Sequence, residues 1–188
     1  TPEKPLFAVI AEAPGAEEDQ QGMPLVGPSG RLLWSELQQH GLSRDQAFVT
    51  NVVKCRPPNN RTPKVSEIKK CSPFLASELD FLQDAGPQYV LALGGTAFKQ
   101  LGGNGSIPEA HGSPYEWNGF TVFPCIHPAA ALRSPQQMKR FKEAIAAFSQ
   151  VVRGKAPSLP DVEIVVVKDN KDLTAMVEDL ADKEWVAY

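Results

Sequence analysis

Residues 6–15 read LFAVIAEAPG and place a short apolar strand directly before a loop. Residues 6–10 are rich in side chains that favour strands, and Pro14 and Gly15 then end the strand. A short run that is apolar at every position is typical of a strand covered on both faces, as in a parallel sheet. We therefore expect this segment to be a strand of such a sheet.

Three further apolar segments, at residues 47–53, 89–93 and 120–126, have the same character. Apolar residues elsewhere recur at intervals of three, four and seven, which predicts helices near residues 29–41, 65–85, 96–101 and 138–152. Strands that alternate with helices predict an α/β fold whose central sheet is mainly parallel and four-stranded, with helices on both sides.

The composition changes after residue 152. Residues 153–161 are rich in Gly, Lys, Pro and Ser, which predicts a linker. Residues 162–188 predict a strand, a helix and the start of another strand, too little to bury a core alone. We therefore expect one domain at residues 1–152, then the linker and an incomplete further segment.

Polar side chains follow three of the predicted strands. Glu12 comes after the first strand, Asn51 lies near the end of the second, and His127 follows the fourth. In parallel sheets the ligand crevice lies beyond the carboxyl ends of the strands, so we expect these three to meet there. Taken singly, Asn51 also fits an amide that ties off a strand end, and Glu12 and His127 fit ordinary loop residues. His40 and His111 lack this context and are expected at the surface or in loops.

The charge balance restricts the partners. The 188 residues carry a net charge of -3, which argues against a generally basic nucleic-acid coat. One local stretch is basic, and it reads either as a solvated face or as a phosphate-binding surface. Its cations are Lys54, Arg56, Arg61, Lys64, Lys69 and Lys70. No apolar run approaches the roughly 20 residues that cross a bilayer, and no signal peptide opens the chain. We expect a soluble protein.

The three cysteines, Cys55, Cys71 and Cys125, do not suggest a disulfide framework, because their number is odd and secretory features are missing. Two alternatives are open: buried free thiols, or ligands of a metal or cluster.

Three blocks of sequence resemble the family-4 uracil-DNA glycosylases. The first is AEAPG at residues 11–15, with EED at 17–19 and GMPLVG at 22–27; the second is TNVVKCRPP at 50–58 with NR at 60–61; the third is HPAAALR at 127–133. The blocks occur in the order of the family, and the match runs from about residue 6 to residue 152.

The resemblance implies a three-layer αβα sandwich that binds uracil-containing DNA for repair. Such a domain would flip uracil out of the stack and hydrolyse its N-glycosidic bond, leaving an abasic site. His127 would stabilise negative charge on the uracil carbonyl, and Glu12 would orient water or stabilise the cationic sugar. The residues implied to bind the base are Ala13, Pro14, Gly15, Leu25 and Asn51, and the Asn51 amide would offer a donor and an acceptor to the uracil edge.

The resemblance also implies DNA contacts and a cofactor. Arg56, Arg61 and Arg133 would contact DNA, and Leu132 would fill the gap left by the extruded base. Cys55 and Cys71, with fifteen residues between them, resemble two of the four cysteines that hold a [4Fe-4S] cluster in the family. The family's other pair lies upstream of the first block and is absent from this sequence, so either the sequence is truncated or the cluster is absent.

Leu25, Ala11 and the missing cysteine pair favour an alternative function, a catalytically weak uracil- or DNA-binding module attached to a polymerase. Leu25 stands where the family has an aromatic residue, Ala11 replaces a glycine, and Ala131 replaces a larger residue. Residues 162–188 resemble the opening of the 3′–5′ exonuclease domain of family-A DNA polymerases. We therefore expect a domain fused to polymerase and exonuclease domains, in the cytoplasm of a bacterial or phage-infected cell.

Overall fold

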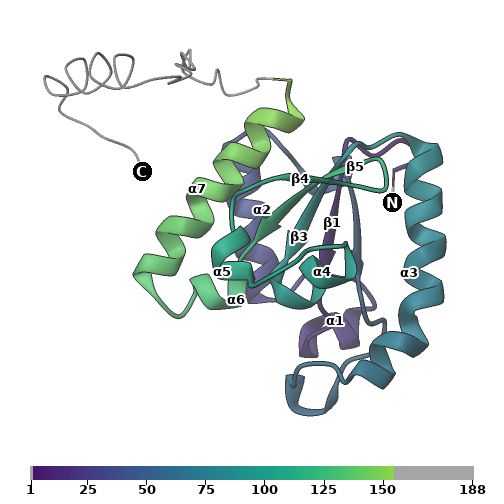
Figure 1. Cartoon of the computed structure of the whole chain (residues 1–188). Helices are drawn as coiled ribbons and strands as arrows, with labels where there is room; N and C mark the ends of the chain where they lie inside the picture. The colour runs from purple at the N-terminus through teal and green to yellow at the C-terminus, as the bar shows by residue number, and fades with distance from the viewer. Residues whose placement is uncertain (1, 155–188) are drawn as a thin grey trace, which may run out of the picture. The chain divides into compact units, whose positions relative to one another are not determined.

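The computed structural model describes residues 2–154, which fold around a five-stranded sheet (Figure 1). The strands are β1 (Phe7–Ala11), β2 (Ala47–Asn51), β3 (Tyr89–Leu93), β4 (Tyr115–Trp117) and β5 (Phe120–Cys125). Their order across the sheet is β2-β1-β3-β5-β4, and every neighbouring pair is parallel except β4 with β5. The predicted α/β fold with a mainly parallel sheet is confirmed.

The short edge strand β4 makes the sheet five-stranded where the sequence predicted four strands. Its residues pair antiparallel with β5 through a tight turn at Asn118 and Gly119, both of which have positive φ. Three residues at a sheet edge, none of them buried, carry no apolar run that periodicity can detect. The other four strands lie where the apolar segments predicted them.

Helices cover both faces of the sheet, as a three-layer αβα sandwich requires. They are α1 (Ala16–Gln21), α2 (Pro28–Gln39), α3 (Val65–Ala85), α4 (Gly94–Gln100), α5 (Ile107–Ala110), α6 (Pro128–Ala131) and α7 (Pro135–Val152), with 3-10 turns η1 (Arg44–Gln46) and η2 (Pro58–Asn60). Helices α2, α6 and α7 pack on one face, and α3 and α4 pack on the other (Figure 1).

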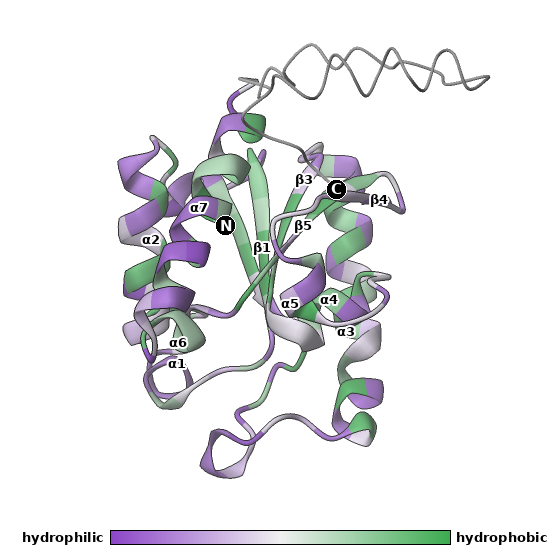
Figure 2. Ribbon diagram, turned by 60° about the vertical axis from the view of Figure 1, so that its left-hand side comes forward, coloured by the Kyte–Doolittle hydropathy of each residue, from purple (hydrophilic) through white to green (hydrophobic). Residues whose placement is uncertain are grey.

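Strand β1 divides its side chains between these two layers. Phe7, Val9 and Ala11 belong to the core beneath α2 and α7, whereas Ala8 and Ile10 belong to the core beneath α3 and α4. All five are buried because successive side chains of a strand point to opposite faces. Figure 2 shows the result as apolar strands in the centre and helices whose polar residues lie outside. Polar residues that are not part of these layers follow the carboxyl ends of the strands.

Helix α7 ends at Val152, where the sequence predicted the domain to end. The expected linker at 153–161 lies almost wholly, and the expected segment at 162–188 wholly, outside the described residues. No helix of residues 2–154 combines the length and apolar character needed to cross a membrane.

Candidate functional site

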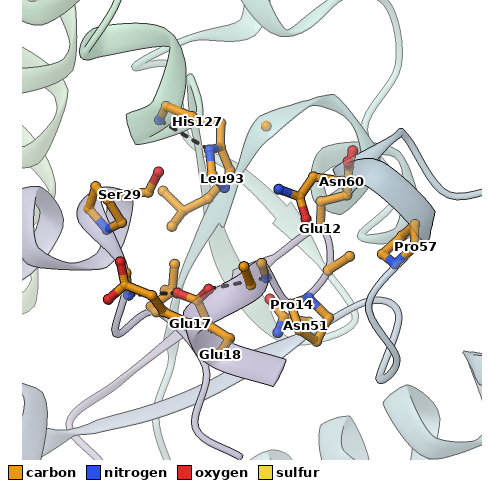
Figure 3. A pocket seen from close by; sticks show the side chains of 18 of the residues that line it. Glu12, Pro14, Glu17, Glu18, Ser29, Asn51, Pro57, Asn60, Leu93 and His127 are labelled. Atoms are coloured by element: carbon orange, nitrogen blue, oxygen red, sulfur yellow. Dashed lines mark hydrogen bonds between the residues drawn. The ribbon is translucent and has the colours of Figure 1, made fainter. Parts of the chain in front are cut away.

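A pocket of about 480 Å³ opens at the carboxyl ends of the parallel strands (Figure 3). Its lining combines the loop after β1, the end of β2, the end of β3 and the turn after β5. Glu12, Asn51 and His127, which are far apart in the sequence, all line it. The structure therefore brings these three residues together at the carboxyl ends of the strands, as the sequence predicted. The pocket volume lies in the range of small-molecule sites.

His127 caps the first turn of α6 and is held in one tautomer. Its Nδ1 atom accepts a hydrogen bond from the Ala129 N–H at 3.2 Å. Burial lowers the pKa of His127 to about 4, with the nearby Glu18 opposing and Arg133 adding to this effect. The imidazole is therefore neutral near pH 7, and its proton is on Nε2 because Nδ1 is an acceptor.

Glycine at position 94 allows His127 to pack close to the end of β3. Gly94 has a φ of 85°, and a Cβ atom there would lie 3.3 Å from Cβ of His127. Both the left-handed backbone and the contact disfavour any other residue. Gly94 and Gly95 both line the pocket and thus shape its wall.

Asn51 ends β2 and is buried, with 6% of its surface exposed. Its side-chain amide makes no hydrogen bond to any residue among 2–154, although it lines the pocket. Its backbone carbonyl accepts a bond from Lys54 Nζ at 2.7 Å, and Lys54 also pairs with Glu78 at 2.5 Å. The backbone of Asn51 is therefore anchored while its amide stays free, which disfavours the role of an amide that ties off a strand.

Glu12 is fixed at both its backbone and its carboxylate. The Val53 N–H donates to its carbonyl at 3.0 Å, and the Thr96 hydroxyl donates to its Oε2 atom at 2.5 Å. Thr96 belongs to α4, and 84 residues separate it from Glu12. No local pattern in the sequence marks this pair, because it depends on the adjacency of β1 and β3.

Glu18 is a second carboxylate of the pocket lining, and sequence reasoning assigned it no role. Its oxygens accept bonds from three backbone N–H groups: Gly15 at 3.1 Å, Val26 at 3.0 Å and Gly27 at 2.8 Å. Burial raises the pKa of Glu18, but these backbone bonds together outweigh it and bring the pKa below its ordinary value. The ionised carboxylate of Glu18 thus links the loop after β1 to the loop before α2 through hydrogen bonds.

Leu25 forms an apolar wall of the pocket in an unusual backbone conformation. It is 5% exposed, and its φ of 53° is left-handed. Its carbonyl accepts bonds from Trp34 Nε1 at 2.9 Å and Arg44 Nη1 at 3.0 Å, and Arg44 also stacks on the Trp34 ring. A Cβ atom at Gly30 would lie 2.0 Å from this carbonyl oxygen. The loop is therefore tightly held, and Ala13, Pro14 and Gly15 line the pocket with it.

The four residues expected to contact DNA lie in different settings. Arg61 and Arg133 line the pocket, whereas Arg56 and Leu132 do not. Arg61 is engaged by Glu67 through bonds of 2.6 and 2.8 Å, and these hold the pKa of Glu67 at about 2. Arg56 donates to Asn60 Oδ1 at 2.7 Å. Leu132 is 50% exposed at the end of α6.

The cysteines do not form a complete ligand set. Cys55 is exposed, Cys71 is partly buried on α3, and Cys125 is buried in β5, where burial raises the pKa of its thiol. Within the described part of the chain there is no group of three or more side chains that could hold a metal ion. Two thiols do not fit a four-iron cluster by themselves, since such a cluster takes four ligands.

Comparison with known proteins agrees with this geometry. Residues 1–149 match the model of the family described as Uracil DNA glycosylase superfamily. A type-4 uracil-DNA glycosylase of Sulfurisphaera tokodaii is 43% identical over 144 residues, covering 71% of this chain and 64% of that protein. One from Pyrobaculum aerophilum is 40% identical over 149 residues, 74% of each chain. A DNA polymerase of Bacillus phage SP01 is 27% identical over 155 residues, 82% of this chain but 16% of the polymerase. The chain thus spans slightly less than two thirds of the first relative's length.

Proposed function

The chain belongs to the uracil DNA glycosylase superfamily, and we propose that it releases uracil from DNA by hydrolysing the N-glycosidic bond. The names of its type-4 relatives support the function predicted from the sequence. The observation that carries the proposal is the pocket itself, where a neutral histidine, an unpaired amide and a carboxylate line one cavity.

Recognition of the base is assigned to Asn51 and Leu25. Uracil must leave the DNA stack to enter a closed pocket, which costs a few kcal/mol. The Asn51 amide presents one donor and one acceptor, the pattern that matches the N3–H and O4 edge of uracil. Cytosine has the opposite pattern there and would leave buried groups unpaired. Leu25 provides apolar contact with the base from the pocket wall.

Bond cleavage is assigned to His127. As the bond between C1′ and N1 breaks, its electron pair moves to the base, and negative charge develops on uracil O2. The Nε2–H of neutral His127 then donates to that oxygen, with the ring orientation fixed by the Ala129 bond. A preorganised donor of this kind is worth roughly 3 kcal/mol in comparable oxyanion sites.

Completion of the reaction is assigned to Glu12. The sugar left behind carries positive charge at C1′, which the carboxylate stabilises across the pocket. Glu12 also orients a water molecule whose oxygen bonds to C1′. One proton of this water goes to the uracil anion, so the products are free uracil and an abasic site.

Binding of the DNA strand is assigned to residues in and near the pocket lining. Arg133 and Arg61 line the pocket and would face the phosphates, with Arg56 nearby in sequence. Leu132 is exposed and would enter the space left by the flipped base.

A [4Fe-4S] cluster is a separate proposal. Cys55 and Cys71 would supply two of its ligands, and the remaining two would come from outside the described residues. No step of the reaction depends on it. Iron content, together with absorbance in the visible range and its loss in the Cys71→Ala variant, tests this proposal independently of activity.

A second candidate function is a uracil- or DNA-binding module attached to a DNA polymerase. The similarity to the phage SP01 polymerase and the aliphatic Leu25 favour it. In this case the pocket would hold uracil without rapid turnover, and fused polymerase and exonuclease domains would be the covalent partners.

One assay separates the two functions. The chain is incubated with a uracil-containing oligonucleotide, treated with alkali and examined for strand scission. The glycosylase predicts scission at uracil, a His127→Ala variant about 100-fold slower or worse, and an unaffected His40→Ala control outside the pocket lining. Retained DNA binding without scission, at enzyme excess, would contradict the proposed glycosylase activity and support the binding module.

A further inference from the structure

The hydrogen bond between Thr96 and Glu12 joins the segments that follow two neighbouring strands of the sheet at the site. Glu12 follows the end of β1, and Thr96 lies in the first turn of α4, directly after β3. The Thr96 hydroxyl donates to Glu12 Oε2 at 2.5 Å. In residues 2–154 the other carboxylate oxygen, Oε1, accepts no hydrogen bond, and Glu12 lines the pocket.

A threonine is well suited to hold a carboxylate in this way. Its branched Cβ restricts the first side-chain torsion, so the hydroxyl keeps a defined direction from the helix. Glutamate has a long side chain that loses rotamer freedom when it is fixed. A hydrogen bond to an ionised group is also stronger than one between neutral groups. The pair therefore places the carboxylate before the substrate arrives.

From this geometry we infer that Thr96 is a positioning residue for the reaction, acting through Glu12. By occupying Oε2, its hydroxyl leaves Oε1 as the oxygen that meets the sugar cation and the water. The inference rests on the proposed function, since it assigns Thr96 to the Glu12 step. Thr96 has no part in base recognition, which belongs to Asn51 and Leu25.

The test compares single-turnover excision of uracil from an oligonucleotide by the full chain and its variants. Thr96→Val keeps the shape but lacks the hydroxyl, and should lower the rate at saturation about tenfold or more. KM should stay within about twofold, because the contacts to the base are intact. Thr96→Ser restores the hydroxyl and should recover the rate to within about threefold of the unmodified chain.

A matched control lies outside the pocket. Thr121 donates to Glu116 Oε1 at 2.6 Å, so Thr121→Val removes a threonine–glutamate hydrogen bond of the same kind at an exposed position. Its excision rate should equal that of the unmodified chain. Thr96→Ala, a second variant without the hydroxyl, gives the answer if Thr96→Val does not fold, and circular dichroism reports folding of each.

A double-mutant cycle makes the assignment specific to Glu12. In a Glu12→Ala background, Thr96→Val should cause no further loss, because the group that it positions is gone. An equal loss in both backgrounds, or a Thr96→Val rate equal to that of the unmodified chain, would overturn the inference and leave the glycosylase standing. Absence of excision by the unmodified chain would overturn the proposed function, a different result that is visible before any variant is compared.

Discussion

The Nδ1 atom of His127 accepts a hydrogen bond from the backbone N–H of Ala129, which leaves the imidazole proton on Nε2. This relationship, with a pKa lowered by burial to about 4, makes His127 a neutral donor rather than a cation. The folded chain takes up a proton at His127 only when the pH falls close to that value. Stability and activity that depend on it are thus present near pH 7 and lost toward pH 4.

The first prediction follows from that neutral form. The excision rate should not rise as the pH falls from 7 to 5, because protonation of His127 is not required for donation from Nε2. Single-turnover rates across this range, with folding monitored at each pH, measure it. A rate that increases through pH 6 in the unmodified chain but not in a His127→Gln variant would show that the charged imidazole is the active form.

The second prediction concerns the glycine that His127 packs against. Gly94→Ala should lower the excision rate and destabilise the fold by about 1–2 kcal/mol, because φ is 85° and a Cβ would crowd His127. Gly119→Ala is the control: its φ is 79°, but a Cβ there meets nothing within 4 Å. Gly119→Ala should therefore show the backbone cost in urea unfolding with a normal excision rate. Equal rates for the two variants would remove the packing argument.

Most of the fold could be predicted from the sequence because its strands are apolar at nearly every position. Such a run identifies a buried strand even when its neighbouring strands in the sheet are not known. Helix α1 was missed because its six residues include no buried one, so no apolar period marks it. Glu12, Asn51 and His127 were found because strand ends of a parallel sheet share one edge. Thr96 and Glu18 were missed for a different reason: their roles depend on contacts across loops, and neither has a local pattern.

The third prediction tests the wall at Leu25. Leu25→Phe should lower KM for a uracil oligonucleotide by about tenfold, because an aromatic ring stacks on a flipped base with roughly 1–3 kcal/mol. Leu25 and Phe share the same left-handed backbone cost, so the exchange isolates the side chain. Leu25→Ala should raise KM instead. If Leu25→Phe also raises KM, the ring does not fit beside the base, and the aliphatic residue is the better partner of this pocket.

The fourth prediction concerns His111, which the sequence placed at the surface or in a loop. The structure has it half-buried: the Ile126 N–H donates to its Nδ1 at 3.1 Å, and its Nε2 lies 3.0 Å from the Arg140 carbonyl oxygen. Burial lowers the pKa of His111, although the bond to Arg140 opposes this. The neutral form therefore stabilises the fold above about pH 6.5, and this contribution is lost as the pH falls further.

Urea unfolding between pH 7.5 and 5 measures this contribution. The free energy of unfolding should fall more steeply with decreasing pH in the unmodified chain than in His111→Gln, which has no ring to protonate. His127 titrates in both proteins and cancels in the difference. Parallel curves for the two proteins would mean that His111 is equally easy to protonate in the folded and unfolded chains.

The fifth prediction separates the two arginines of the pocket lining. In the described residues Arg133 is exposed and its guanidinium makes no hydrogen bond or ion pair, whereas Glu67 holds the guanidinium of Arg61 through two bonds. A DNA phosphate can pair directly with the guanidinium of Arg133, whereas at Arg61 it must compete with the Glu67 carboxylate. Arg133→Ala should therefore weaken DNA binding and reduce the slope of log K against log salt concentration by about 1. Arg61→Ala should change that slope less.

The Glu67→Gln variant removes the competing charge and should raise the affinity for DNA through Arg61. An Arg61→Ala, Glu67→Gln double variant should show no such gain. Fluorescence anisotropy with a labelled oligonucleotide, at several salt concentrations, gives the slopes for the unmodified chain and the four variants. Equal slope changes for Arg133→Ala and Arg61→Ala would mean that DNA displaces Glu67 at little cost, and the ion pair would then not limit phosphate binding.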